Sequence, residues 1–259
     1  MSDEKANNLV QPASVEFQRH NPSLWLKPYV RNYWMLQCSG APALPRRHRV
    51  VPDGCIDLIF MRRSVTEDYR ASIVGTMTRS IGEELASHMH YIGIRFNPGG
   101  FRYFFQTPPR ELTDRIVSLD DLASTSGLAE RLADSHGSTA SLESLEDELA
   151  RRFRPEERDL LPAGLLEAIS ACNGNVPMTQ LGRMTGWSPR QLRRMFHESI
   201  GVGPKTFCRI IRFMSAFRAL RRNPRASFLD VALDAGYYDQ AHFIHEFEDF
   251  YGSSPSMIF

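Results

Sequence analysis

The chain has 259 residues, of which 42% are hydrophobic and 24% are charged, a composition that excludes a largely disordered or fibrous protein. The formal net charge is +1, and this total by itself gives no indication of a nucleic-acid partner. The four cysteines lack metal-like spacing, and no secretory signal or membrane-spanning apolar run is present. We therefore expect a cytoplasmic protein with reduced thiols and no membrane partner. We also expect a flexible tail over residues 1–20, because the chain begins with a polar run over residues 1–8.

Residues 21–108 alternate between short apolar runs and turns that contain proline or glycine. This pattern predicts a small β-sandwich or barrel, with strands over 29–36, 56–61, 73–76 and 88–96. The sequence Asn97-Pro98-Gly99-Gly100 is expected to end the last of these strands.

Between residues 109 and 160, leucines recur at helical spacing among Glu, Ala and Arg. The spacing predicts amphipathic helices that link two domains or form a dimer contact. A charged segment with a proline places the domain boundary near 155–163, and residues 163–259 have the pattern of helices separated by glycines and prolines. The predicted fold class is thus α+β: an N-terminal β-sandwich or barrel, a helical linker and an all-α C-terminal domain.

The segment 178–196 has the pattern of a helix-turn-helix. Gly186 can end the first helix in a left-handed conformation, and Ser188 and Pro189 suit the cap and first position of the second helix. The inward side of that second helix is expected to carry Leu192, Met195 and Phe196, and the outward side Arg190, Arg193 and Arg194. Arginine presents a planar fork of donors that matches guanine or two phosphate oxygens, so this helix is predicted to recognise DNA.

A second helix-turn-helix is predicted over 229–247, after a long helix over 205–222. Ala232 is the small residue at the helix crossing, Gly236 forms the turn, and Asp239 caps the second recognition helix. The inward side of this helix is expected to carry Phe243, Phe247 and Phe250. The outward side is expected to carry Gln240, Ala241, His242, Ile244 and His245.

The two units resemble the DNA-binding domain of AraC/XylS-type transcription regulators. The shared motifs are Gly186-Trp187-Ser188, Gly201-Val202-Gly203-Pro204, Gly236-Tyr237-Tyr238-Asp239-Gln240 and Gly252-Ser253-Ser254-Pro255. Gly182 stands where the family usually has Ala, Ala241 where Ser is usual, and Glu248 where Lys or Arg is common. Segments 52–59 and 95–100 resemble the N-terminal domain of one branch of these regulators, which implies a cupin-like sensor domain.

The resemblance implies sequence-specific binding of double-stranded DNA and regulation of transcription. It also implies control by a small molecule bound in the N-terminal β-domain, with RNA polymerase and a second copy of the chain as further candidate partners. The alternative is a DNA-binding regulator whose N-terminal domain has no ligand and serves only dimerisation or partner docking. The sequence leaves the effector and the choice between activation and repression open.

The charge is unevenly distributed. Residues 178–225 contain eleven Lys or Arg and one acid, a charge of +10, whereas residues 226–259 have a charge of −6 and residues 1–177 a charge of −3. The first unit and the long helix thus carry the positive charge that phosphates attract, while the second unit is acidic. We predict that the first unit dominates DNA affinity. The second unit would then add contacts from Gln240, His242 and His245 or would contact another protein. The alternative is that it also inserts normally, through His and Gln contacts.

The predicted DNA contacts form three groups. The first recognition helix supplies Ser188, Arg190, Gln191, Arg193 and Arg194. The long linker helix supplies phosphate contacts from Lys205, Arg209 and Arg212. The second recognition helix supplies Asp239, Gln240, Ala241, His242 and His245.

The predicted ligand pocket of the β-domain is lined by residues on one face of a strand, namely His88, His90, Ile92 and Ile94. Two histidines suggest a metal site, but no third ligand follows at suitable spacing, so we expect no metal and no cofactor. Asp53 precedes a glycine and is expected to stabilise a turn. Asp57 is expected to form an ion pair or to cap a helix. No nucleophile or phosphate-loop motif occurs, so we expect no catalytic residue and no enzyme activity.

Overall fold

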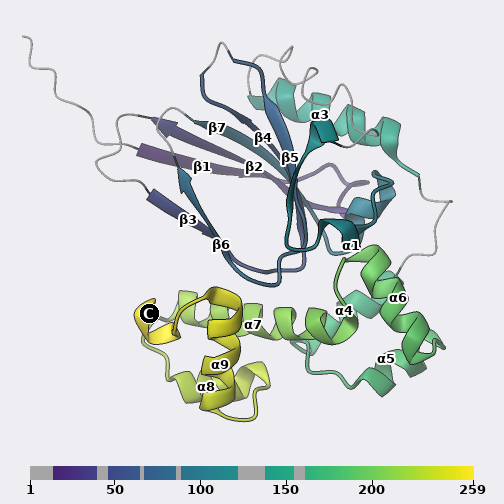
Figure 1. Ribbon diagram of the computed structural model, residues 1–259, viewed down its shortest axis with the longest axis vertical. Helices are drawn as coiled ribbons and strands as arrows, with labels where there is room; N and C mark the ends of the chain where they lie inside the picture. The colour runs from purple at the N-terminus through teal and green to yellow at the C-terminus, as the bar shows by residue number, and fades with distance from the viewer. Residues whose placement is uncertain (1–13, 40–45, 65–66, 86–88, 122–137, 155–160) are drawn as a thin grey trace, which may run out of the picture.

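The computed structural model describes residues 14–39, 46–64, 67–85, 89–121, 138–154 and 161–259 (Figure 1). The N-terminal part is built around an antiparallel sheet, and the C-terminal part consists of helices. The predicted α+β class is therefore confirmed. Within the residues just given, no helix combines the length and the apolar character needed to cross a membrane.

The N-terminal domain contains a six-stranded sheet in the order β1-β2-β7-β4-β5-β8 and a two-stranded sheet formed by β3 and β6. The strands are β1 (Ser14–His20), β2 (Val30–Ser39), β3 (Arg46–Val50), β4 (Ile56–Arg62), β5 (Arg70–Val74), β6 (Ile81–Leu85), β7 (His90–Phe96) and β8 (Ile116–Ser118). The four predicted strands correspond to β2, β4, β5 and β7. At the centre of the sheet, Ile94 of β7 lies opposite both Tyr33 and Leu58, and all three side chains are buried.

The expectation of a flexible tail over residues 1–20 is wrong for its second part, because Ser14–His20 is a strand that pairs with β2 along its whole length. The ring of Phe17 also stacks on Trp34, with 6.4 Å between the ring centroids. The strand carries only two alternating apolar residues, Val15 and Phe17, which is too short a pattern to predict it, and pairing with β2 defines it instead. Residues 1–13 lie outside the described part of the chain.

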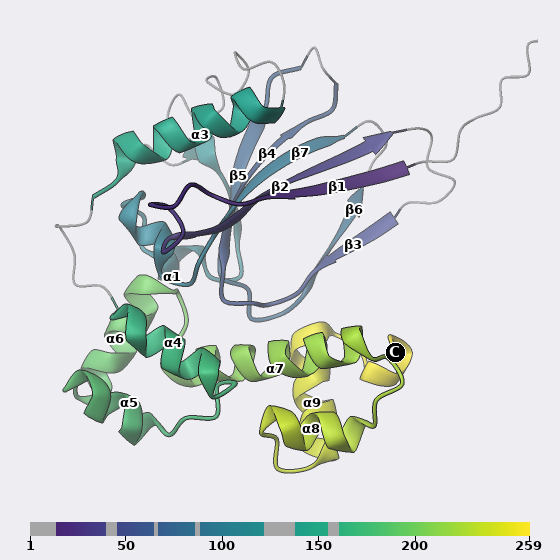
Figure 2. The same cartoon turned by 180° about the vertical axis from the view of Figure 1, so that it is seen from behind.

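The predicted helical linker over 109–160 is also corrected, because its described parts belong to the β-domain. These parts contain α1 (Pro109–Leu112), strand β8, the 3-10 helix η2 (Leu119–Asp121) and α3 (Ser138–Arg152). Helix α3 lies across the sheet (Figures 1 and 2), where Leu145 and Leu149 share a core with Leu58 and Ile94. The leucine spacing correctly indicated a helix with a buried face, but spacing does not say which surface covers that face. Residues 122–137 and 155–160 lie outside the described segments.

A charged network holds the turn between β3 and β4. Arg95 donates to Asp57 from Nε at 3.0 Å and from Nη2 at 2.9 Å, and its Nη1 lies 3.3 Å from Asp53. Trp34 Nε1 donates to the same Asp57 carboxylate at 3.0 Å. Burial opposes the charge on Arg95, but the two carboxylates outweigh it and raise its pKa. Asp53 also accepts from the backbone N–H of Cys55, so both aspartates have the structural roles expected of them.

The C-terminal domain packs its helices around one hydrophobic core. They are α4 (Ala163–Ala171), α5 (Met178–Thr185), α6 (Pro189–Ser199), α7 (Pro204–Arg222), α8 (Phe228–Ala235) and α9 (Gln240–Tyr251), followed by the 3-10 helix η3 (Pro255–Met257). Helix α7 runs between the α5–α6 pair and the α8–α9 pair (Figure 2). The ring centroid of Phe213 in α7 lies 5.5 Å from that of Phe247 in α9, and Phe196 in α6 lies 5.9 Å from Phe207 in α7. Aromatic packing against one rigid helix therefore ties both pairs together.

The four thiols are expected to differ sharply in reactivity. Cys172 is exposed, whereas Cys38, Cys55 and Cys208 are buried, and burial raises the pKa of Cys55 and raises that of Cys208 to about 11. In native protein near neutral pH, Cys172 should react rapidly with a thiol reagent such as dithionitrobenzoate and the other three should not. All four should react in denaturant. Rapid release of more than one equivalent from the native chain would contradict this burial pattern.

Candidate nucleic-acid interface

The first helix-turn-helix consists of α5 and α6, joined at Gly186, whose φ of 70° is left-handed as predicted. Ser188 and Gln191 form a reciprocal capping box at the start of α6. The backbone N–H of Gln191 donates to Ser188 Oγ at 3.3 Å, and the backbone N–H of Ser188 donates to Gln191 Oε1 at 2.9 Å. With Pro189 at the first helical position, this box fixes where the recognition helix begins.

The two faces of α6 differ in chemistry as the sequence predicted. Leu192, Met195 and Phe196 are buried in the core. Arg190, Arg193 and Arg194 are exposed, and none of them forms an ion pair with any residue that the structure describes. Three guanidinium groups are therefore free to approach base edges or phosphates. Ser188 and Gln191 are exposed beside them, but their side chains bind each other.

Ser188→Ala is expected to lower the free energy of unfolding by about 1 kcal/mol, because the backbone N–H of Gln191 loses its acceptor at the helix start. Ser188→Asp keeps an acceptor and adds negative charge at the positive end of α6, so its stability should stay close to that of the unaltered protein. Urea denaturation followed by circular dichroism measures both. Equal stability of the Ala variant and the unaltered protein would show that the cap contributes nothing.

The second helix-turn-helix consists of α8 and α9. Gly236 forms the turn with a φ of 89°, and Asp239 caps α9 by accepting the backbone N–H of His242 at 2.7 Å. Ala232 is fully buried at the helix crossing, as expected. The inward stripe is confirmed by the buried side chains of Phe243, Phe247 and Phe250.

The outward side of α9 carries four exposed side chains, those of Gln240, Ala241, His242 and His245. Ile244 was expected on the same side but is half-buried and packs against the core. The Asp239 carboxylate is exposed and is used as the helix cap. The second recognition surface is thus polar with no permanent cation, in contrast to the first.

The linker helix is tied to α9 by ion pairs that the sequence analysis missed. Glu246 is only 3% exposed, and its carboxylate lies 2.7 Å from Arg209 Nε and 3.4 Å from Arg212 Nε. Arg209 Nη2 also donates to Asp249 at 3.2 Å. Burial lowers the pKa of Arg209, but the two carboxylates outweigh burial and raise it. Glu246 occurs within the inward aromatic stripe of α9. An acidic residue on the buried face of a helix needs a partner, so the sequence could have predicted a buried ion pair at this position.

These ion pairs change the interpretation of the predicted linker contacts. Lys205 is exposed, whereas Arg209 and Arg212 already have carboxylate partners inside the protein. Phosphate binding by the three residues stays a prediction, and for the two arginines the geometry favours a structural role. The acids of the second unit that remain outside this cluster are Asp230, Asp234, Asp239 and Glu248.

The β-domain contacts the chain directly after the first recognition helix. The carbonyl oxygen of Ile200 accepts from Thr76 Oγ1 at 2.5 Å, and that of Gly201 accepts from Thr113 Oγ1 at 2.8 Å. The last carbonyls of a helix lack partners within it, so these threonines complete the end of α6. Because threonine is common and main-chain acceptors leave no sequence signal, this contact could not be predicted.

The β-domain also contacts the end of the second recognition helix. The carbonyl oxygen of Phe250 accepts from the backbone N–H of Ser80 at 2.7 Å, and that of Tyr251 accepts from Ser80 Oγ at 2.6 Å and Arg49 Nη1 at 2.9 Å. The Arg49 guanidinium also lies 4.5 Å from the ring centroid of Tyr251. Both recognition helices are thus held at their C-terminal ends by the same domain.

Between these two contacts, the turn at Gly54 lies against the linker helix. Its φ of 77° is left-handed, and a Cβ there would come within 2.6 Å of the Phe207 ring in α7. Only glycine therefore allows this close approach. The turn is the one held by Asp53 and Asp57, so the charged network of the β-domain supports the contact with the DNA-binding domain.

The predicted ligand-pocket residues do not gather around a cavity that the structure shows. Ile92 and Ile94 are buried in the hydrophobic core of the β-domain, His90 is half-buried at the start of β7, and His88 lies outside the described residues. A ligand bound by these side chains stays a prediction. In the described segments, no group of three His, Cys, Asp or Glu side chains is arranged to hold a metal ion.

Comparison with known families and proteins separates the two parts of the chain. Residues 181–259 match a family described as a helix-turn-helix domain, and residues 18–118 match a domain of unknown function, DUF6597. An uncharacterized HTH-type transcriptional regulator of Haemophilus influenzae is 35% identical over 96 residues, which are 37% of this chain and 32% of the relative. The HTH-type transcriptional regulator GlxA of Rhizobium meliloti is 32% identical over 109 residues, 42% of this chain and 33% of the relative.

The chain spans about a third of the length of these curated relatives. Among solved structures, ToxT from Vibrio cholerae aligns with 95% of this chain and 97% of its own, with a TM-score of 0.45 and 9% sequence identity.

Proposed function

We propose that this chain, whose residues 181–259 are an AraC-type helix-turn-helix domain, is a sequence-specific DNA-binding transcription regulator. The observation that carries the proposal is the pairing of two capped recognition helices on one rigid linker helix. Both helices expose their N-terminal halves while their C-terminal ends are held by the β-domain. A regulator of this kind acts on chromosomal DNA in the cytoplasm.

In this proposal α6 supplies most of the affinity. Arg190, Arg193 and Arg194 occupy its first two turns, where a recognition helix meets base edges in the major groove. Helix α9 would add hydrogen bonds from Gln240 and His242, with adenine as a suitable partner for the glutamine amide. Lys205, exposed near the start of α7, would contact phosphate.

Selection of bound sequences from random double-stranded DNA tests the proposal. We expect enriched sites with two conserved boxes whose centres lie about one helical turn, roughly 34 Å, apart. The box read by α6 should be the more strongly conserved, and guanines should dominate it. Failure to enrich any sequence at near-physiological salt would overturn the proposal. Two equally conserved boxes would instead contradict the unequal contribution of the two units.

We further propose that a small molecule controls DNA binding through the N-terminal domain. The direct contacts of this domain with α6, α7 and α9 support the idea, because they offer a route by which a change in the β-domain reaches both recognition helices. The alternative is a domain without a ligand that serves a homodimer contact or docks a partner such as RNA polymerase. Thermal-shift screening of the full chain separates the two: saturable stabilisation by a compound supports control by a ligand. A change of mass with concentration, without any such compound, supports dimerisation.

A further inference from the structure

The C-terminal end of the linker helix carries four arginines that the DNA contacts described above do not include. They are exposed, and none of them forms an ion pair with any residue that the structure describes; they are Arg218, Arg221, Arg222 and Arg225. The first three lie three and four positions apart in the last turns of α7, so their side chains are neighbours on the helix surface. Arg225 follows in the turn that leads into α8. These four residues are called the arginine patch below.

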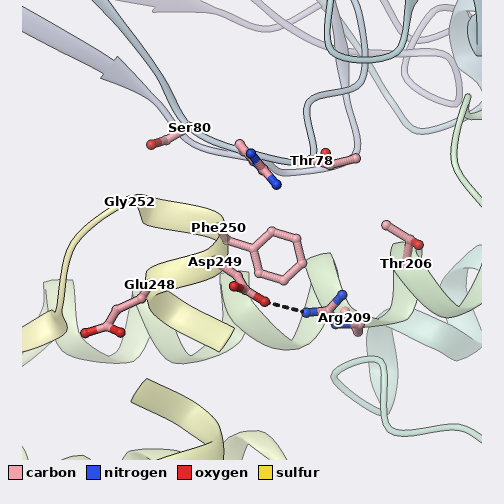
Figure 3. Close-up of a pocket in the computed structure, with 9 residues that line it drawn as sticks. Thr78, Ser80, Thr206, Arg209, Glu248, Asp249, Phe250 and Gly252 are labelled. Carbon is pink, nitrogen blue, oxygen red and sulfur yellow. Dashed lines mark hydrogen bonds and ion pairs between the residues drawn. The ribbon is translucent and has the colours of Figure 1, made fainter. Parts of the chain in front are cut away.

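The arginines in the middle of α7 are used inside the protein. Arg209 lines a polar cavity formed by α7, the end of α9 and the β-domain, and Figure 3 shows it paired with Asp249 there, with 3.2 Å between Nη2 and the carboxylate. Arg212 likewise has a carboxylate partner on α9. The cations of α7 that have no ion-pair partner in the described part of the chain are therefore Lys205, near its start, and the arginine patch, at its end.

The second helix-turn-helix has no cations of its own to meet phosphates. Residues 226–259 contain six acids and no Lys or Arg, and Asp230 and Asp234 are exposed on α8. In a helix-turn-helix, the first helix crosses the sugar-phosphate backbone while the second lies in the major groove. Helix α8 is that first helix, so insertion of α9 would bring an acidic helix next to phosphates. This approach is repulsive unless cations close to α8 offset the negative charge.

We propose that the arginine patch binds the phosphate backbone of DNA beside the groove that α9 enters. Arg225 lies only two residues before Ser227, which caps α8, so the patch adjoins the start of the helix that crosses the backbone. A guanidinium presents a fork of donors that suits two phosphate oxygens, and an extended backbone can contact several arginines in turn. The patch thus supplies the positive charge that the sequence of the second unit lacks.

This inference rests on the proposed function and assigns phosphate contacts that it leaves open. Contacts with phosphates fix the position of a protein on DNA but carry no sequence information. The second unit would therefore be held on the backbone by the arginine patch, while any base recognition there still comes from the polar side chains of α9. Helix α6 keeps the larger share of sequence recognition.

The salt dependence of DNA binding tests the proposal. The double variant Arg222→Gln and Arg225→Gln removes two charges from the patch, and the double variant Arg63→Gln and Arg70→Gln removes the same charge from exposed positions of the β-domain. Fluorescence anisotropy of the full chain with a selected DNA site, over a range of salt concentrations, measures the dissociation constant. The patch variant should bind about tenfold more weakly, and its slope of log affinity against log salt should be shallower by about 2. The β-domain variant should match the unaltered protein in both.

Duplexes with uncharged methylphosphonate groups locate the contact. Beside the box that α9 reads, these groups should weaken binding of the unaltered protein and the β-domain variant, but should have a much smaller effect on the patch variant, which has already lost its partners for those phosphates. Beside the box that α6 reads, they should weaken all three proteins by a similar factor.

An unchanged salt slope in the patch variant would overturn the proposal and would indicate that the patch faces an acidic protein surface instead. Equal losses for all three proteins on DNA neutralised beside the α9 box would overturn it as well. If selection recovers the α6 box while the patch variant binds like the unaltered protein, this inference alone fails. If selection recovers no sequence, the proposed function fails and this inference fails with it.

Discussion

Arg193→Ala is expected to weaken sequence-specific DNA binding by about 1–3 kcal/mol, or roughly 5- to 150-fold in the dissociation constant. Arg193 is exposed on α6 and has no ion-pair partner among the described residues, so its guanidinium is not committed to the fold. The capping box at Ser188 and Gln191 fixes the helix that presents it. Removing this side chain should therefore remove the predicted DNA contact without weakening a structural one.

Fluorescence anisotropy with a selected site, at fixed salt, measures the effect. Arg63→Ala is a matched control, because Arg63 is exposed in the β-domain, away from both recognition helices, and should bind DNA unchanged. His245→Ala in the exposed face of α9 should cost less than Arg193→Ala, since an imidazole presents fewer hydrogen-bond donors than a guanidinium. A larger cost for His245→Ala would contradict the dominance of the first unit.

Asp57→Ala is expected to lower the free energy of unfolding by about 3–5 kcal/mol, the usual cost of removing one partner of a buried ion pair. The Asp57 side chain is 6% exposed and accepts hydrogen bonds from Arg95 and Trp34. Without it, Arg95 keeps only the longer contact with Asp53, and the indole N–H of Trp34 loses its acceptor. The variant should also loosen the turn at Gly54 and its packing on Phe207.

Urea denaturation followed by circular dichroism and by tryptophan fluorescence measures this loss. Asp57→Asn keeps an acceptor for Trp34 but not the charge, so its stability should fall between those of the Ala variant and the unaltered protein. Asp68→Ala removes an exposed carboxylate from the same domain and should change stability by less than about 0.5 kcal/mol. If Asp57→Ala were no more destabilising than Asp68→Ala, the network would not support the fold.

Local sequence was sufficient to predict the DNA-binding domain. The caps at Ser188 and Asp239, the left-handed turns at Gly186 and Gly236, and the inward Phe residues all occur as expected. Each of these features depends on residues a few positions apart, and their backbone geometry is set by interactions within one or two helical turns. The same locality explains why β2, β4, β5 and β7 were found, since each has an apolar run bounded by turns.

The errors occurred where the deciding partner is distant in the sequence. Strand β1 depends on pairing with β2, and the assignment of α3 depends on which sheet covers its leucines. The ion pair of Arg209, whose contact with phosphate stays a prediction, was missed for the same reason. Its partner Glu246 lies 37 positions later, and only the packing of α9 on α7 brings the two together.

The sequence by itself determined the helix-turn-helix units, their exposed arginines and the separation of charge between them, because spacing along a helix fixes which side chains share a face. Tertiary structure decided which charges remain free. It pairs Arg209 and Arg212 with Glu246 and leaves Arg193 available. The physical reason is that an ion pair between distant residues forms only when folding brings their surfaces together. No local sequence pattern identifies the two partners.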